Sequence, residues 1–365
     1  MKKIEINIPG NKYPVFIGQN AFDSLTKVLR SKKMYKSIFL IVDSAIMNLH
    51  REDITRFTSN YAGKVCIYEY FAKEHHKNFE SLQKIFHNLL DKEFGKDTVI
   101  IAVGGGITGD IAGFSASSFM RGVSYVQVAT TLLAAVDSSV GGKTGINFNE
   151  TKNTIGSIYQ PEFVLVDTAF LRTLPEEEVI CGIGEILKYA FLIDQKFFTV
   201  LKNNFSKLHK VEHTFITKVI ETCILFKGDV VAQDEKESGL RKILNFGHTF
   251  AHAIEIEQNH QIKHGQAVTV GILCALDLSR RLGFLEEKLH SEMIKLPLML
   301  RDKIRVKKFD PEKIYDIMKR DKKSRDQKIK FVLLNDYGKL IVDAEATREE
   351  VFQSITKGMS HFLPY

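Results

Sequence analysis

Cysteine is scarce in this sequence, and its few copies lie far apart. The four cysteines are Cys66, Cys181, Cys223 and Cys274, and no CxxC pair occurs among them. Disulfide frameworks and thiolate zinc sites both need regularly spaced cysteines, so we expect neither. A reducing, cytoplasmic location fits this usage.

Long hydrophobic runs are also missing. The apolar run from Val99 to Val103 has the length of a strand, whereas a membrane-spanning helix needs about 18 apolar residues. The N-terminal MKKIEINIPG alternates apolar and polar residues, and a signal peptide would have a continuous apolar segment. We therefore expect an N-terminal β-strand and no membrane partner.

Blocks of like charge are absent as well, although the formal net charge is +7. The lysines are scattered, and no run reaches the roughly five or six like charges of a nucleic-acid-binding tail. We expect no nucleic-acid partner. Scattered cations would equally attract a small anionic substrate.

The first half of the chain alternates short apolar runs with helix-like stretches, which predicts a parallel α/β sheet. The predicted strands are SIFLIV from Ser37, VCIYEY from Val65, TVIIAV from Thr98, VSYVQV from Val123 and FVLV from Phe163. After Pro175 helical spacing dominates, in residues 176–193, 215–231, 250–257 and 267–282. A late hairpin is predicted for IKFVLL and KLIV, and Thr347 with Glu350 predicts a capping box that opens the last helix.

The length of 365 residues exceeds the ~250 to 300 residues at which single cores usually stop growing. We therefore expect two domains, an α/β nucleotide-type domain over residues 1–172 and a mainly α-helical domain over residues 173–365. A ligand cleft is expected between them.

A glycine-rich loop, from Gly104 to Gly109, follows the strand TVIIAV and precedes a helix-like stretch. This is the setting of a dinucleotide pyrophosphate loop, because glycines let backbone N–H groups approach phosphate at a helix N-terminus. A tight turn without a ligand is the alternative. No acidic residue follows about 20 positions later, so an earlier strand end such as Asp43 is expected to contact the ribose.

Carboxylate and imidazole groups suitable for a catalytic zinc are concentrated in the second half, at Glu185, His248, His252 and His264. His248 and His252 are four residues apart and share a helix face. Each histidine alone is more often an ordinary surface or hydrogen-bonded residue than a metal ligand. The group nevertheless predicts a three-ligand metal site with an open position for substrate.

Cations lie next to these motifs in the sequence. Singly, each is expected to be solvated, but together they suit a substrate that carries phosphate and carboxylate. They are Arg121, Lys143, Lys152, Lys188, Lys227 and Arg241.

Six segments in order resemble the 3-dehydroquinate synthase family of the sugar-phosphate cyclases. They are GGGITGDIAGFSASSFMRG, TTLLAAVDSSVGGKTGIN, KNTIG, GEILK, DEKESGLRKILNFGHTFAHAIE and HGQAV, between about Glu74 and Val268. The resemblance implies a homodimer with a Rossmann-like NAD-binding α/β N-terminal domain and a mainly α-helical metal-binding C-terminal domain. It implies NAD and Zn²⁺ or Co²⁺ as cofactors. The implied enzyme is a phosphate-eliminating lyase that converts a phosphorylated keto acid, 3-deoxy-arabino-heptulosonate 7-phosphate, to 3-dehydroquinate.

The same resemblance implies roles for individual residues. Glu185, His248 and His264 correspond to metal ligands. Phosphate-side contacts are implied for Lys143, Lys152, Asn153, Lys188, Asn245 and His252, with Arg121 reaching into the neighbouring subunit's site. Carboxylate and hydroxyl contacts are implied for Asp137, Lys227 and Arg241. For NAD the implied positions are Asp43, Glu74, Lys77, Gly105, Gly106, Asp110, Thr130, Thr131, Lys143, Lys152, Phe170 and Thr173.

Departures from the family pattern occur at a few positions. Ala129, Ala135 and Gly184 stand where the family usually has proline, glutamine and alanine. The loop after Asp321 lacks the usual glycine, which leaves open whether Lys322 or Lys323 contacts phosphate.

Other activities remain open at this point. One is a different sugar-phosphate cyclase such as 2-deoxy-scyllo-inosose synthase, whose substrate has no carboxylate. Another is a metal-dependent polyol dehydrogenase resembling glycerol dehydrogenase, which would release NADH. A non-catalytic binding protein is suggested only by the net charge.

Overall fold

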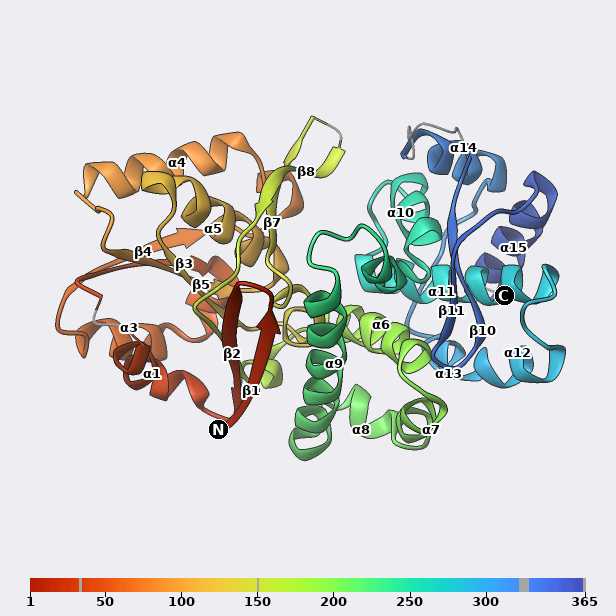
Figure 1. Cartoon of the computed structure of the whole chain (residues 1–365), viewed down its shortest axis with the longest axis horizontal. Coiled ribbons are helices and arrows are strands. Elements are labelled where there is room, and N and C mark those ends of the chain that lie inside the picture. The colour runs from red at the N-terminus through yellow and green to blue at the C-terminus, as the bar shows by residue number, and fades with distance from the viewer. Residues whose placement is uncertain (33–34, 150, 322–327, 364–365) are drawn as a thin grey trace. The chain divides into compact units, whose positions relative to one another are not determined.

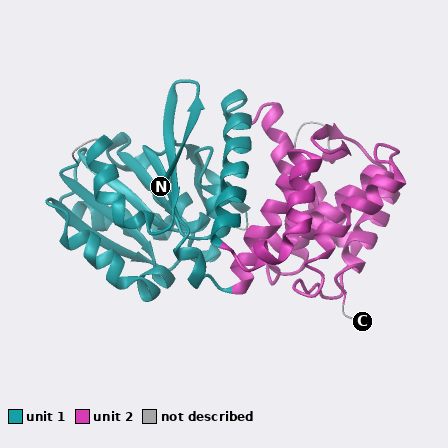
Figure 2. Cartoon of the chain, turned by 90° about the horizontal axis from the view of Figure 1, so that it is seen from below, with its two compact units in different colours: residues 1–175, 213–236 teal, residues 176–212, 237–365 magenta. Residues whose placement is uncertain are grey.

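The computed structural model describes residues 1–32, 35–149, 151–321 and 328–363. The chain forms two compact units, which Figure 2 shows in different colours. Unit 1 comprises Met1–Pro175 and His213–Lys236, and unit 2 comprises Glu176–Glu212 and Glu237–Tyr365. One domain was expected over residues 173–365, whereas α9 (His213–Gln233) belongs to unit 1, where it packs on β1 (Lys2–Ile8).

Unit 1 is built on a seven-stranded sheet in the order β1-β2-β9-β6-β5-β3-β4 (Figure 1). β1 pairs antiparallel with β2, and all other neighbours in this sheet are parallel. Alternate residues of β5 enter two different apolar clusters, Val99 and Ile101 in one and Ile100 and Ala102 in the other. Both faces of the sheet are therefore covered, which explains why its central strands are continuous apolar runs.

The strands of this sheet coincide with the predicted ones except β2, which no pattern in the sequence predicted. Their bounds are β1 Lys2–Ile8, β2 Asn11–Gly18, β3 Ser37–Asp43, β4 Lys64–Tyr70, β5 Thr98–Gly104, β6 Ser124–Ala129 and β9 Phe163–Asp167. The other helical elements of unit 1 are α1 Leu25–Lys32, α2 Ser44–Leu49, α3 Arg51–Ser59, α4 Phe79–Asp91, α5 Gly106–Ser118, and the short turns η1 Ala21–Ser24, η2 Glu74–His76, η3 Phe119–Arg121, η4 Ala134–Ser138 and η5 Phe170–Thr173. The predicted Rossmann-like α/β domain is confirmed.

An antiparallel hairpin of β7 (Lys143–Phe148) and β8 (Thr151–Ile158) lies outside the main sheet of unit 1. No pattern in the sequence predicted this hairpin. Most of β8 is exposed and polar, so its sequence lacks the apolar alternation by which strands are recognised. Near its base Gly145 pairs with Gly156. A Cβ added at Gly156 would lie 2.0 Å from the carbonyl oxygen of Thr144.

Unit 2 is mainly α-helical, as predicted. Its elements are α6 Glu176–Leu192, α7 Gln195–Asn203, α8 Phe205–His209, η6 Leu240–Asn245, α10 His248–Glu257, α11 His264–Arg281, α12 Glu287–Met293, α13 Lys295–Leu298, α14 Pro311–Asp321, β10 Phe331–Asp336, β11 Lys339–Ala344 and α15 Arg348–Ser360. Helix α11 is almost entirely buried and packs against α6, α10 and α15.

Two predicted features of the C-terminal region are confirmed: the β10–β11 hairpin and the capping box in which Thr347 and Glu350 open α15. Lys322 and Lys323 lie outside the described residues. None of the described helices is both long and apolar enough to span a bilayer.

Candidate metal centre and nucleotide loop

Three helices of unit 2 bring one carboxylate and two imidazoles together. Glu185 lies within α6, and His248 and His264 are the first residues of α10 and α11. Nε2 of His264 is 3.2 Å, and Nε2 of His248 is 3.5 Å, from the same oxygen of Glu185, Oε1. Atoms that bind one tetrahedral ion at about 2.1 Å lie about 3.4 Å from one another, so this spacing is that of a ligand set.

The polar groups around Glu185 fit a cation. The residue is 1% exposed, and its carboxylate oxygens face the ammonium group of Lys188 and the imidazoles of His248 and His264. Burial alone would raise the pKa of Glu185, but Lys188, with Nζ 2.8 Å from Oε2, and His248 outweigh burial and hold the pKa well below 4.5. An ionised carboxylate with two imidazoles is a donor set that suits Zn²⁺ or Co²⁺.

The hydrogen bond of His248 also favours metal binding. Its Nδ1 lies 3.2 Å from the carbonyl oxygen of Phe246. If Nδ1 carries the proton and donates it there, the lone pair of Nε2 faces Glu185. Gly247 makes this turn with φ 79°, a conformation that favours glycine, directly before α10.

Further predicted residues of unit 2 lie on the same elements. The ring of His252 is exposed, with its centroid 5.6 Å from that of His248 and 5.9 Å from that of His264. Arg241 is buried in η6, and Asn245, at the end of η6, donates a 2.6 Å hydrogen bond to Glu237. Sequence reasoning did not single out Glu237, although it lies in the same DEKESGLR segment.

In unit 1 the glycine loop joins β5 to α5. Gly105 is the residue before α5 and offers no side-chain cap to the helix N-terminus. A Cβ at Gly105 would lie 2.9 Å from Cγ2 of Thr131, and a Cβ at Gly106 would lie 3.0 Å from Oγ of Ser138. Glycine thus avoids two tight side-chain contacts here, and the uncapped backbone N–H groups fit a dinucleotide pyrophosphate.

Next to this loop, Lys77 joins several predicted nucleotide-side residues. Its Nζ is 2.5 Å from Oδ2 of Asp110 and also donates to Asn153 of β8. The amide of Asn147 donates to Glu74 at 2.8 Å. These contacts fasten the β7–β8 hairpin to η2 and α5.

The other predicted nucleotide-side residues of unit 1 lie at strand ends and in short turns. Asp43 ends β3 and caps α2 by accepting from the backbone N–H of Ala45. Thr130 follows β6, and its N–H donates to the Gly104 carbonyl at 3.1 Å. In η5, Oγ1 of Thr173 lies 2.8 Å from Nε2 of His50.

The predicted cations of unit 1 differ in exposure. Lys227 of α9 is buried, and its Nζ is 2.8 Å from both the carboxylate and the backbone carbonyl of Asp137. Lys143 and Lys152 are exposed on the hairpin. Arg121 is also exposed, at the end of η3, where it has φ 59° between Met120 at 48° and Gly122 at 106°. A left-handed backbone conformation costs of order 1–3 kcal/mol per non-glycine residue. The backbone that exposes Arg121 is therefore strained, and it lowers the stability of the fold.

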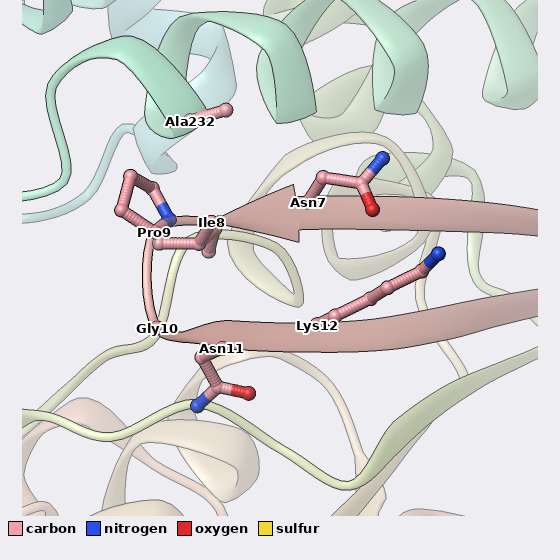
Figure 3. A pocket seen from close by; sticks show the side chains of 7 residues that line it. All are labelled: Asn7, Ile8, Pro9, Gly10, Asn11, Lys12 and Ala232. Atoms are coloured by element: carbon pink, nitrogen blue, oxygen red, sulfur yellow. The ribbon is translucent and has the colours of Figure 1, made fainter.

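A hollow of about 510 Å³ in unit 1 lies beside the β1–β2 turn, and Figure 3 shows its lining. The lining residues are Asn7, Ile8, Pro9, Gly10, Asn11, Lys12 and Ala232. None of the predicted site residues is among them.

The fold places the chain in a recognisable class. It matches the structure of a 2-deoxy-scyllo-inosose synthase solved with carbaglucose-6-phosphate, NAD⁺ and Co²⁺, with a TM-score of 0.87 at 24% identity over 98% of this chain and 100% of that one. It matches 2-epi-5-epi-valiolone synthase from Streptomyces hygroscopicus subsp. jinggangensis 5008, with NAD⁺ and Zn²⁺ bound, with a TM-score of 0.84 at 22% identity over 95% and 97%. A probable glycerol dehydrogenase from Sinorhizobium meliloti 1021 matches with a TM-score of 0.65 at 17% identity, over 95% of this chain and 96% of that one. The fold is that of sugar-phosphate cyclases, shared with metal-dependent dehydrogenases.

Sequence comparison identifies the family within this class. Residues 67–181 match the model of the 3-dehydroquinate synthase N-terminal domain, and residues 182–324 match that of the C-terminal domain. The 3-dehydroquinate synthase of Pelagibacter ubique (strain HTCC1062) is 39% identical over 92% of this chain and 93% of its own length. The 3-dehydroquinate synthase of Clostridium tetani (strain Massachusetts / E88) is 36% identical over 98% of this chain and 95% of its own length. The chain belongs to the 3-dehydroquinate synthase family, which confirms the resemblance inferred from its motifs.

Proposed function

We propose that the chain converts 3-deoxy-arabino-heptulosonate 7-phosphate to 3-dehydroquinate and phosphate, a lyase step of the shikimate pathway towards aromatic amino acids. The observation that carries this proposal is family membership across both halves of the chain. The convergence of Glu185, His248 and His264 supports it independently, because the reaction needs a metal site.

The proposed reaction has no net redox change. The hydroxyl at C5 is oxidised, which makes the proton at C6 acidic; this proton and the phosphate at C7 are then lost. The C5 ketone is reduced again, the ring opens, and an intramolecular aldol reaction closes the carbocycle. When bound, NAD supplies the reversible oxidant and a divalent cation supplies a Lewis acid.

The residues of unit 2 have the following proposed roles. Glu185, His248 and His264 hold the cation. Lys188 is 1% exposed and paired with Glu185, so its charge is fixed beside the metal position. We assign Arg241 to the substrate carboxylate, and Asn245 and His252 to polar contacts with substrate.

Unit 1 is proposed to bind NAD and to supply further cations. Gly105 and Gly106 would hold the pyrophosphate. Lys227, fixed by Asp137, would bind the substrate's carboxylate or hydroxyl groups. Exposed cations would bind phosphate, namely Lys143, Lys152 and Arg121.

A coupled assay tests this proposal. The purified protein, NAD, Zn²⁺ and the heptulosonate phosphate should release phosphate and form dehydroquinate, while absorbance of NADH does not accumulate. A chelator should abolish turnover. Accumulating NADH with a polyol would instead support a dehydrogenase, and turnover of a phosphorylated sugar without a carboxylate would support another cyclase.

We further propose that the enzyme is a cytoplasmic homodimer. None of the four cysteines forms a disulfide bond, and all four are buried, which agrees with a reducing compartment. Light scattering on the eluting protein tests the dimer: a mass near twice 41.5 kDa is expected, and a monomer at assay concentration would contradict it.

A further inference from the structure

The imidazole of His264 has a second nitrogen, and a buried carboxylate lies next to it. Nδ1 of His264 is 3.3 Å from Oε2 of Glu255, in hydrogen-bond geometry. Glu255 belongs to α10, one turn after His252, and is 5% exposed. Burying a carboxylate is costly unless it is paired, so a contact with a ligand-type histidine calls for an explanation.

The two nitrogens of an imidazole point to opposite sides of the ring, so only one of them can bind a given ion. In His264 Nε2 faces Glu185 at 3.2 Å, and Nδ1 faces Glu255. A proton on Nδ1, donated to Glu255, leaves the lone pair on Nε2. His248 has the corresponding arrangement with the Phe246 carbonyl as its acceptor.

We propose that Glu255 is a positioning residue, which fixes the tautomer and ring orientation of His264 so that Nε2 binds the catalytic cation. It acts through His264 and does not touch the cation. Outer carboxylates of this kind also raise the basicity of the histidine ligand. The inference rests on the metal site proposed above.

A different arrangement would use Glu255 directly. His252, Glu255 and His264 also offer ligand atoms within 4.8 Å of one another. That set would take Nδ1 of His264, and it includes the exposed ring of His252. It would leave Oε1 of Glu185, a residue that is 1% exposed, facing Nε2 of both His248 and His264 with no metal ion between them. The set with Glu185 is therefore favoured.

The test is metal affinity of Glu255→Gln, because the amide keeps the shape of the side chain and removes its charge. The matched control is Glu257→Gln, which changes another buried carboxylate of α10 in the same way. Glu257 accepts from the N–H of Asp310 at 3.2 Å and belongs to neither ligand set. Metal-free forms of wild type and both variants are titrated with Zn²⁺ against a chelator of known affinity.

We expect Glu255→Gln to weaken Zn²⁺ binding by about 10- to 100-fold, the usual effect of losing an outer-shell partner. Glu257→Gln should stay within about twofold of wild type. In the Co²⁺-loaded protein, NMR should show two hyperfine-shifted exchangeable N–H signals, from His248 and His264. Glu255→Gln should alter only one of them.

Equal affinity of Glu255→Gln and Glu257→Gln would overturn the proposal, as would a structure with Glu255 bound directly to Zn²⁺. If Glu255→Gln does not fold, the wild-type Co²⁺ spectrum still decides, because a missing His264 Nδ1–H signal refutes the assigned tautomer. If the wild type itself binds no metal, the proposed function fails instead.

Discussion

The backbone of Gly265, beside His264, packs so closely on α6 that Gly265→Ala should disturb the candidate metal centre. A Cβ at Gly265, the second residue of α11, would lie 1.8 Å from the carbonyl oxygen of Cys181 and 2.5 Å from its carbonyl carbon. Both partners are backbone atoms of α6, so no side-chain rotation can relieve the overlap. A normal carbon–oxygen contact of about 3.3 Å would require α6 and α11 to separate locally by about 1.5 Å.

Two consequences follow from this separation. Overpacking of this kind costs typically 1–3 kcal/mol, and the helix propensity of alanine returns only about 1 kcal/mol. We therefore expect the free energy of unfolding to fall by up to about 2 kcal/mol. The shift also moves His264 away from Glu185 by far more than the ~0.2 Å tolerance of zinc–ligand distances, so Zn²⁺ affinity should fall at least about 10-fold.

Urea unfolding of the metal-free protein and Zn²⁺ titration against a chelator measure the two effects. Gly95→Ala is a suitable control, because its Cβ would meet only Oδ1 of Asp97, at 3.5 Å. A Gly265→Ala protein with unchanged stability and unchanged Zn²⁺ affinity would refute the argument that this contact is rigid.

Three further predictions use other residues. Glu185→Ala should lose stoichiometric Zn²⁺ by elemental analysis, and turnover with it; a metal-loaded, fully active variant would contradict the ligand set. Arg241→Ala should raise KM for the substrate at least about 10-fold while NAD binding by fluorescence titration stays unchanged, because a lost charged contact costs about 1.5–3 kcal/mol; unchanged kinetics would remove its assigned role. Burial, together with Arg280, lowers the pKa of His290. Its unfolded form is then protonated first as pH falls below about 6.5, so the free energy of unfolding should decrease with falling pH. That slope should be shallower in His290→Gln by urea unfolding at pH 7.5 and 5.5, and equal slopes would contradict it.

The sequence was sufficient for features that have a local signal. The strands β3, β5 and β9 are buried on both sides, so their sequences are continuous apolar runs. The start of α15 is predicted by its capping box. The β7–β8 hairpin gave no such signal, since its exposed residues are polar and two paired glycines form its base. Nor can a sequence show that α9 packs on β1, because that contact is between segments distant in the chain.

At the candidate metal centre, the sequence predicted which residue types could bind a cation, but it could not predict how the helices pack around them. The residue types indicated four candidates, Glu185, His248, His252 and His264, and the family resemblance excluded His252 as a ligand. Glu255 resembled any helical glutamate, because only the fold shows that it is buried against His264. Gly184 was noted only as a departure from the family pattern. The structure supplies a physical reason, since a Cβ there would lie 1.9 Å from the carbonyl oxygen of Gly265.

The cations predicted to bind substrate fall into two physical kinds. Lys188 and Lys227 are buried and paired with Glu185 and Asp137 inside their own units. An ordered lysine has already lost about 1.5–2 kcal/mol of side-chain freedom, so these two can contact an anion without losing it again. Lys143 on the exposed hairpin is not ordered in this way by burial, and its charge is more strongly screened by salt. The buried cations are therefore suited to fix the orientation of the reacting carbons, and the exposed ones to attract and hold a phosphate that must leave.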